Sequence, residues 1–164
     1  MTASPVRLAI AGALGRMGQA VERTAQGRED VTVSARFDRP DAQGEGLVTQ
    51  AQALSQADVV IDFTVPEASV ALAEAAAGRG GVALVIGSTG LSPDQIRRID
   101  EAARRIPIVR SGNYSLGVNM LLGLVAQAAR ALPDDFDIED FEAHPRRPVA
   151  APSSPALLLG AAAA

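Results

Sequence analysis

A glycine-rich turn near the N-terminus is the strongest chemical signal in the chain. It occupies residues 12–18 and reads Gly12, Ala13, Leu14, Gly15, Arg16, Met17 and Gly18. The turn follows an apolar run that predicts a strand and precedes a stretch that predicts a helix. Glycines at such a junction let the backbone approach a diphosphate, whose charge is met by free N–H groups and the helix dipole. The spacing is G-x-x-G-x-x-G, with Leu14 where G-x-G-x-x-G has its second glycine, so the turn could also serve packing alone.

An acid and a base follow the second predicted strand. Asp38 comes 20 residues after Gly18, about the separation at which an acid meets the ribose hydroxyls of a dinucleotide. Arg39 is placed to meet a ribose phosphate instead. Both could be solvated loop charges, but the order of strand, glycine turn, helix, strand and acid favours dinucleotide binding. The presence of both residues suggests that NADH and NADPH are each accepted.

Two further loops of small polar residues follow predicted strands. The first reads Gly87, Ser88, Thr89 and Gly90, and the second reads Ser111, Gly112, Asn113, Tyr114 and Ser115. Open α/β folds place their ligands at the carboxyl ends of the strands, where both loops should lie. They could be tight turns, but they also suit the walls of a nicotinamide pocket.

His144 is the one histidine in the sequence and thus the candidate for a general acid that titrates near neutrality. A single histidine at a loop edge is more often an ordinary surface residue. The neighbouring Arg146 and Arg147 could bind a carboxylate bidentately or be solvated. The sequence shows no metal-ligand spacing and no G-x-S-x-G nucleophile elbow.

The composition excludes several classes of site and partner. The 164 residues contain no cysteine, and all 15 basic residues are arginine. Disulfides, thiolate sites, lysine Schiff bases and the P-loop lysine are therefore excluded. A net charge of −4 with scattered arginines argues against nucleic acid or an anionic membrane as partner. With no signal peptide or membrane span in the sequence, we expect a cytoplasmic protein.

Alternation of short β-branched runs with alanine-rich stretches predicts an α/β fold, a Rossmann-like doubly wound parallel sheet. The predicted strands are residues 6–11, 31–37, 59–63, 82–86 and 106–109, with a further strand at 136–143. The predicted helices are residues 16–27, 66–78, 93–105, 118–132 and 156–164. Ser92 and Pro93 are the expected N-cap and first residue of one helix. Prolines should prevent regular structure from Pro145 to Pro155.

Six segments together resemble the dihydrodipicolinate reductase family, also called 4-hydroxy-tetrahydrodipicolinate reductase, of bacterial lysine biosynthesis. They are GALGRMG at 12–18, Asp38 with Arg39, VVIDFTVPEAS at 59–69, VIGSTGLS at 85–92, GNYSLGVNMLL at 112–122 and DIEDFEAHPRR at 137–147. The resemblance implies reduction of a cyclic unsaturated dicarboxylate by NADH or NADPH, usually in a homotetramer. It implies a dinucleotide-binding domain at residues 1–115 and the beginning of a mixed α/β substrate and oligomerisation domain at 116–164.

The resemblance also assigns residues. It places the cofactor at Gly12, Ala13, Leu14, Gly15, Arg16, Met17, Asp38, Arg39, Gly87, Ser88, Thr89, Ser111, Gly112, Asn113 and Tyr114. It makes His144 the catalytic acid/base and places substrate binding at Ser153 and Ser154.

The sequence departs from the family pattern after the histidine. Pro148 stands where the family has its proton-donating lysine, and Ala150 stands where it has an acid. Ser154 and Pro155 replace the Gly-Thr pair that holds a substrate carboxylate. A non-catalytic, dinucleotide-binding relative or fragment is therefore the alternative function. A different NAD-dependent dehydrogenase on the same fold is a third, because a fold does not fix chemistry.

Overall fold

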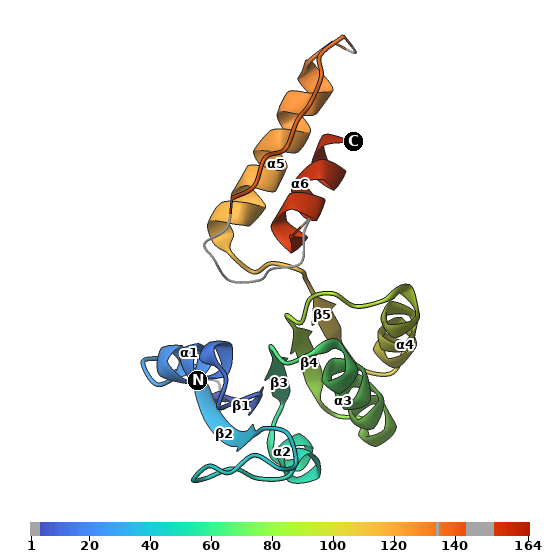
Figure 1. Cartoon of the computed structure of the whole chain (residues 1–164). Coiled ribbons are helices and arrows are strands. Elements are labelled where there is room, and N and C mark those ends of the chain that lie inside the picture. The colour runs from blue at the N-terminus through green and yellow to red at the C-terminus, as the bar shows by residue number, and fades with distance from the viewer. Residues whose placement is uncertain (1–3, 134, 144–152) are drawn as a thin grey trace. The chain divides into compact units, whose positions relative to one another are not determined.

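A computed structural model of the protein describes residues 4–133, 135–143 and 153–164 (Figure 1). The chain divides into two compact units, Met1–Arg110 and Ser111–Ala164. The functional division at residue 115 that the sequence suggests stays a prediction.

The first unit is built on a parallel β-sheet. Its described residues form five strands in the order β2-β1-β3-β4-β5, and every neighbouring pair is parallel. The strands are β1 (Val6–Ala11), β2 (Val31–Phe37), β3 (Val59–Asp62), β4 (Ala83–Ile86) and β5 (Ile108–Arg110). The strand order reverses between β1 and β3, and open α/β sheets bind ligands at such a switch point, outside the carboxyl ends of the strands.

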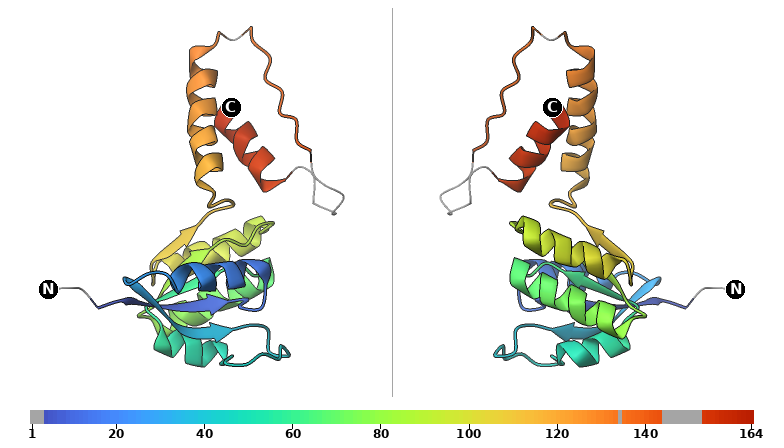
Figure 2. Two further views of the ribbon diagram at one scale, coloured as in Figure 1. Left: turned by 90° about the vertical axis from the view of Figure 1, so that its left-hand side faces the viewer. Right: turned by 90° about the vertical axis from the view of Figure 1, so that its right-hand side faces the viewer.

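Helices cover both faces of this sheet. They are α1 (Arg16–Ala25), α2 (Gln50–Gln56), α3 (Pro66–Arg79) and α4 (Pro93–Ala103). The two opposite views of Figure 2 show α1 on one face and α3 and α4 on the other. Parallel strands are joined by right-handed crossovers, so the reversal of strand order after β2 moves the later helices to the opposite face. The predicted α/β fold with a doubly wound parallel sheet is confirmed.

Capping boxes define the start of two helices. Ser92 accepts a hydrogen bond from the backbone N–H of Gln95, whose side chain accepts one from the N–H of Ser92, and Pro93 opens α4 as predicted. Thr49 and Gln52 form the same reciprocal pair at α2. Each such cap is worth about 1 kcal/mol. The sequence analysis did not predict α2.

The core of the first unit is aliphatic, and much of it is alanine. The larger fully buried side chains include Ile10, Leu72, Leu84, Ile86 and Ile99. Between them lie alanines without exposed surface on β1, α2 and α3, namely Ala9, Ala53, Ala73 and Ala76. A side chain that ends at Cβ lets a helix lie close to the sheet, because little volume separates the two backbones.

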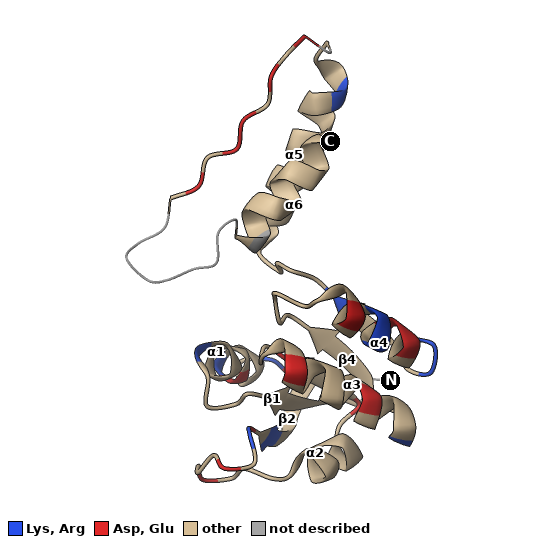
Figure 3. Cartoon of the chain, turned by 45° about the vertical axis from the view of Figure 1, so that its right-hand side comes forward, with Lys and Arg blue, Asp and Glu red and all other residues tan. Residues whose placement is uncertain are grey.

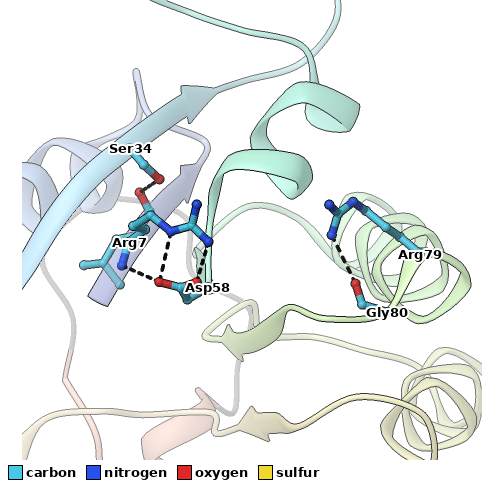
Figure 4. Close-up of polar contacts among 6 residues, drawn as sticks. Arg7, Ser34, Asp58, Arg79 and Gly80 are labelled. Atoms are coloured by element: carbon cyan, nitrogen blue, oxygen red, sulfur yellow. Dashed lines mark hydrogen bonds and ion pairs between the residues drawn. The ribbon is translucent and has the colours of Figure 1, made fainter. Parts of the chain in front are cut away.

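An ion pair joins the amino ends of β1 and β3 (Figure 4). Asp58 Oδ1 accepts a hydrogen bond from Arg7 Nη2 at 2.7 Å, and its Oδ2 accepts one from the backbone N–H of Arg7 at 2.9 Å. Hydrogen bonding to this guanidinium lowers the pKa of Asp58 below its usual value. In the same view Ser34 donates to a carbonyl of β1, and Arg79 donates to the carbonyl of Gly80. Arg7 and Asp58 lie at the amino ends of β1 and β3, whereas the glycine turn follows the carboxyl end of β1.

The second unit contains two helices among its described residues, α5 (Leu116–Ala131) and α6 (Ser154–Ala163), which contact each other. Five acidic residues are spread along the segment 135–143, whereas α5 and α6 carry little charge (Figure 3). In the part of the chain that the structure describes, no helix has the length and apolar character needed to cross a membrane.

Two predictions in this region are wrong. Residues 136–143 form no strand, because a strand needs a hydrogen-bonded neighbour and the described residues of this unit offer none. The prolines were expected to prevent regular structure from Pro145 to Pro155, but α6 begins at Ser154. Pro155 falls in the first helical turn, where a missing N–H costs nothing. Residues 145–152 lie outside the described part.

The predicted element ends shift by a few residues elsewhere. The strand predicted at 106–109 is observed as β5 (Ile108–Arg110). The backbone N–H of Ile106 instead bonds to the carbonyl of Ala102 at the end of α4, and Pro107 has no N–H to donate. Helix α5 starts at Leu116 rather than at residue 118, because Ser115 is its N-cap.

Candidate functional site

The glycine turn connects β1 to α1, and two of its glycines, Gly12 and Gly18, have a steric reason. Gly12 has a φ of +68°, which residues with a side chain rarely adopt. A Cβ on Gly12 would lie 2.8 Å from Cγ2 of Thr64, and one on Gly18 would lie 2.2 Å from the carbonyl oxygen of Gly12. Packing alone therefore explains Gly12 and Gly18.

The residues after Gly15 offer open N–H groups for binding. Gly15 is the N-cap of α1 and provides no side chain to the first turn of the helix. The N–H groups of Arg16 and Met17 have no acceptor within the helix, because they belong to its first turn. Open N–H groups at the positive end of a helix dipole form an anion site, and a diphosphate fits this arrangement.

Asp38 lies beside this turn and is hydrogen-bonded to it. Its Oδ2 accepts a hydrogen bond from the backbone N–H of Leu14 at 2.9 Å, and its Oδ1 accepts one from the N–H of Arg39 at 2.9 Å. The structure thus brings together the two features that the sequence predicted as parts of one site. The side chain of Arg39 is exposed and forms an ion pair with Asp41 at 3.4 Å.

The loop after β4 begins at Gly87, which is a packing glycine. A Cβ at this position would lie 2.1 Å from Cε1 of Phe63, so the aromatic ring occupies the space that any side chain would need. The N–H of Gly87 donates to the carbonyl of Asp62 at 2.7 Å. Ser88 is buried and Thr89 is exposed, so the loop offers Thr89 to a ligand and turns Ser88 inward.

A buried polar cluster under this loop was missed by the sequence analysis. The carboxylate of Asp62, at the end of β3, accepts hydrogen bonds from the backbone N–H and the hydroxyl of Thr64 and from the hydroxyl of Ser69 on α3. The hydroxyls of Ser69 and Ser88 are hydrogen-bonded to each other at 2.8 Å. Asp62 and Ser69 have no exposed surface. An acid that ends a buried strand and is followed by Thr and Ser was the available signal.

The loop predicted after β5 belongs to the second unit and is ordered by its own side chains. Ser111 Oγ donates to the carbonyl of Asn113 at 2.8 Å, and the Oδ1 of Asn113 accepts from the N–H of Ser115 at 2.7 Å. Asn119 on α5 donates to the carbonyls of Asn113 and Ser115. Contact of Ser111, Gly112, Asn113 and Tyr114 with a cofactor stays a prediction.

The predicted substrate residues lie at the start of α6. Ser153 is buried and is the N-cap of this helix, and its backbone N–H donates to Oε1 of Glu142 at 2.9 Å. Ser154 is the first helical residue. An adjoining hollow of about 410 Å³ is lined by Asp140 and Glu142, whose charge is unsuited to a dicarboxylate. His144, Arg146, Arg147, Pro148 and Ala150 lie outside the described residues.

Comparisons with known proteins give the family of this chain. The family model described as dihydrodipicolinate reductase, N-terminus, matches residues 6–114. A 4-hydroxy-tetrahydrodipicolinate reductase of Caulobacter vibrioides is 66% identical over 98% of this chain and 63% of its own length. One of Methylocella silvestris is 44% identical over 97% of this chain and 64% of its own length. The chain thus spans less than two thirds of these relatives.

A solved structure extends the likeness to the fold. The dipicolinate-bound dihydrodipicolinate reductase of Paenisporosarcina sp. TG-14 is similar with a TM-score of 0.74 and 20% identity, over 98% of this chain and 66% of the other. At that identity the similarity concerns the fold. The matched residues 6–114 contain the glycine turn, Asp38 and the loop after β4, and with the close sequence relatives they show that this chain belongs to the dihydrodipicolinate reductase family.

Proposed function

We propose that this protein takes part in the reduction of 4-hydroxy-tetrahydrodipicolinate to tetrahydrodipicolinate by NADH or NADPH, in lysine and diaminopimelate biosynthesis. The observation that carries the proposal is the 66% identity to the Caulobacter reductase over 98% of the chain. In the net reaction a hydride and a proton are taken up, and the hydroxyl group leaves as water. The reduced nicotinamide supplies the hydride when it is bound.

The first unit fits the adenosine diphosphate half of such a cofactor. The N–H groups of Arg16 and Met17 bind the diphosphate, and Asp38 accepts hydrogen bonds from the ribose hydroxyls. Because Asp38 is already held by the N–H of Leu14, its carboxylate is in place before the ribose arrives. Arg39 meets the extra phosphate of NADPH, which requires it to exchange its ion pair with Asp41.

The loop after β4 is the proposed contact of the nicotinamide half, and the family resemblance also assigns Ser111, Gly112, Asn113 and Tyr114 to the cofactor. Thr89 offers an exposed hydroxyl, and Gly87 allows the ring of Phe63 to pack under the loop.

His144 is the proposed acid that delivers the proton, with Ser153 and Ser154 near a substrate carboxylate. Pro148 and Ala150 stand where the family has its lysine and an acid, which favours the alternative of a cofactor-binding relative without turnover. One missing general acid costs about 10² to 10⁴ in rate.

Binding and turnover together test the proposal. NADH and NADPH fluorescence should be enhanced or quenched on titration with the protein. Oxidation of NADPH should follow when the substrate is generated from pyruvate and aspartate semialdehyde. Binding without oxidation would favour the non-catalytic relative, and no binding of either nucleotide would contradict both functions.

Restoring the family residues tests the substrate half. The double variant Pro148→Lys/Ala150→Asp should raise any residual rate, because it returns a proton donor and an acid. A folded double variant with unchanged NADH affinity and no gain in rate would show that residues beyond these two limit turnover.

The remaining parts of the proposal concern assembly and partners. The family resemblance implies a homotetramer in the cytoplasm that acts on a small cyclic dicarboxylate. A net charge of −4 supports the absence of nucleic acid or an anionic membrane among its partners. Light scattering coupled to size-exclusion chromatography measures the oligomeric state directly.

A further inference from the structure

The buried Asp62 carboxylate needs an explanation beyond the end of a strand. Asp62 has no exposed surface, and a buried charge is costly unless hydrogen bonds compensate it. It receives them from the backbone N–H of Thr64 at 2.8 Å, from the Thr64 hydroxyl and from the Ser69 hydroxyl. An apolar residue at position 62 could end β3 without needing any of these hydrogen bonds.

The direction of the hydrogen bonds in this cluster follows from the carboxylate. An ionised carboxylate only accepts, so the one proton of the Ser69 hydroxyl goes to Asp62. The hydrogen bond between Ser69 and Ser88 must then use the proton of Ser88. The Ser88 hydroxyl therefore donates to Ser69 and not to a ligand. Hydrogen-bond donors for a ligand at this loop come from the backbone and from Thr89.

The residues around Asp62 contact two of the segments assigned to the cofactor, the glycine turn and the loop after β4. Asp62 accepts the N–H of Gly87 on its carbonyl, and Phe63 packs under the same glycine. Thr64, fixed by the Asp62 carboxylate, places its methyl group against Gly12 of the glycine turn. One carboxylate at the β1/β3 switch point thus holds the partners of two separate loops.

We propose that Asp62 is a positioning residue for dinucleotide binding, acting through Ser69 on the loop at Ser88 and through Thr64 on the turn at Gly12. It does not touch the cofactor. This inference rests on the proposed function, because the loops matter to binding if they hold the two halves of a dinucleotide.

Two ligands distinguish the two branches of the cluster, the one from Asp62 through Ser69 to Ser88 and the one from Asp62 through Thr64 to Gly12. NADH should contact the glycine turn and the loop after β4, whereas ADP-ribose should contact only the glycine turn and Asp38. Ser69→Ala cuts the branch to Ser88, so it should weaken NADH binding about tenfold, the scale of one lost buried hydrogen bond, and leave ADP-ribose binding within about twofold. Asp62→Ala cuts both branches and should weaken both probes.

A conservative variant tests the role of the hydrogen bonds themselves. In Asp62→Asn the amide oxygen still accepts from Thr64, and the amide nitrogen donates to Ser69, which then donates to Ser88. The chain of hydrogen bonds is complete but reversed. Asp62→Asn should therefore bind NADH more tightly than Asp62→Ala and less tightly than the wild type. It also reports on the cluster if Asp62→Ala fails to fold.

Leu54→Ala is the control for a merely structural effect. Leu54 is buried in α2 and contacts the same core, so its truncation should lower the melting temperature without changing the affinity for NADH. Equal NADH affinity in the wild type and in folded Ser69→Ala would overturn the inference. So would a parallel loss of both probes in Ser69→Ala.

Hydrogen exchange gives a measurement that needs no ligand. The Gly87 amide is hydrogen-bonded to Asp62, and Ser69→Ala should speed its exchange while the Leu14 amide, bonded to Asp38, keeps its rate. A wild-type chain that binds neither nucleotide would contradict the proposed function and this use of Asp62. Unchanged exchange at Gly87 in Ser69→Ala would contradict the anchoring alone, even in a chain that binds NADH.

Discussion

The backbone N–H of Leu14 donates a hydrogen bond to the carboxylate of Asp38 at 2.9 Å. This bond joins the turn after β1 to the loop after β2, which are 24 residues apart in sequence. The two features proposed to bind the diphosphate and the ribose therefore hold each other in place, and a change at one should be felt at the other.

Removing the charge of Asp38 should change the preference between the two nucleotides. In Asp38→Asn the amide oxygen still accepts from Leu14, but the carboxylate that accepts the ribose hydroxyls is lost. We expect NADH affinity to fall about tenfold and NADPH affinity to fall less, because the extra phosphate no longer faces a negative charge. Fluorescence titration with both nucleotides checks this ratio, and equal losses would contradict the assignment of Asp38.

Arg39 should affect NADPH alone. Arg39→Gln removes the cation proposed to meet the extra phosphate, so we expect weaker NADPH binding and unchanged NADH binding. Asp41→Asn is the matched control, because it releases Arg39 from its ion pair and should leave NADPH binding equal or tighter. A loss of NADH affinity in Arg39→Gln would place this arginine elsewhere in the site.

Gly15 allows a test that separates charge from folding. Aspartate and asparagine are both good N-caps, and either adds the same Cβ, 3.1 Å from the carbonyl oxygen of Gly12. Both variants should melt within a few degrees of each other. Gly15→Asp puts a negative charge where the diphosphate binds and should weaken NADH at least about tenfold more than Gly15→Asn. Calorimetry and titration of the pair measure the two effects, and equal affinities would argue against an anion site.

Much of the first unit could be predicted from local sequence. The bounds of β1 and β2 are those predicted, because β1 is a mostly apolar run that ends at a glycine and β2 alternates apolar with polar residues. Helix α2 was missed because it has seven residues, few of them apolar, and its main signal is the Thr49 capping box. The false strand at 136–143 shows that alternation cannot report whether a neighbouring strand exists.

The same distinction applies to the site. Gly12 could be predicted because a positive φ and a close approach both require glycine. The Asp62 cluster was harder to predict: the acid at the end of a strand was a signal, but its serines lie 7 residues from Asp62 and a further 19 along the chain. It is the register of β3 against β4, with Asp62 opposite Ile86, that brings Ser88 to Ser69.

A side chain at Gly87 should destabilise the fold while Phe63 is present. In Gly87→Ala the new Cβ would meet the aromatic ring at 2.1 Å, so we expect a loss of about 1 to 3 kcal/mol in the free energy of unfolding. Phe63→Leu in the same chain should recover part of it by freeing space. Urea unfolding of the two single variants and the double variant measures this coupling, and strict additivity would contradict it.

Acid should weaken the tie between Arg7 and Asp58. Because the guanidinium lowers the pKa of Asp58 in the folded protein, its contribution to stability is present above its usual pKa near 4 and is lost as the pH falls through the lowered value. Asp58→Asn should therefore flatten the dependence of melting temperature on pH below about pH 4.

Arg7→Met controls for that result. It removes the arginine instead of the acid. It should flatten the dependence of melting temperature on pH in the same range to a similar degree. Asp30 and Glu74 also have lowered pKa values from arginine partners, so the flattening is partial. Unchanged slopes in both variants would show that this ion pair contributes nothing measurable.

At the alanines that line the interior of the first unit, larger substitutions should be more destabilising than smaller ones. At Ala9, Ala53 and Ala73 there is almost nothing to truncate, so cavity formation is a minor hazard there. Added methyl groups would instead push apart backbones that are already in close contact. Divergence at these sites is consequently restricted to residues as small as alanine. Larger apolar side chains introduced to stabilise the domain would destabilise it instead.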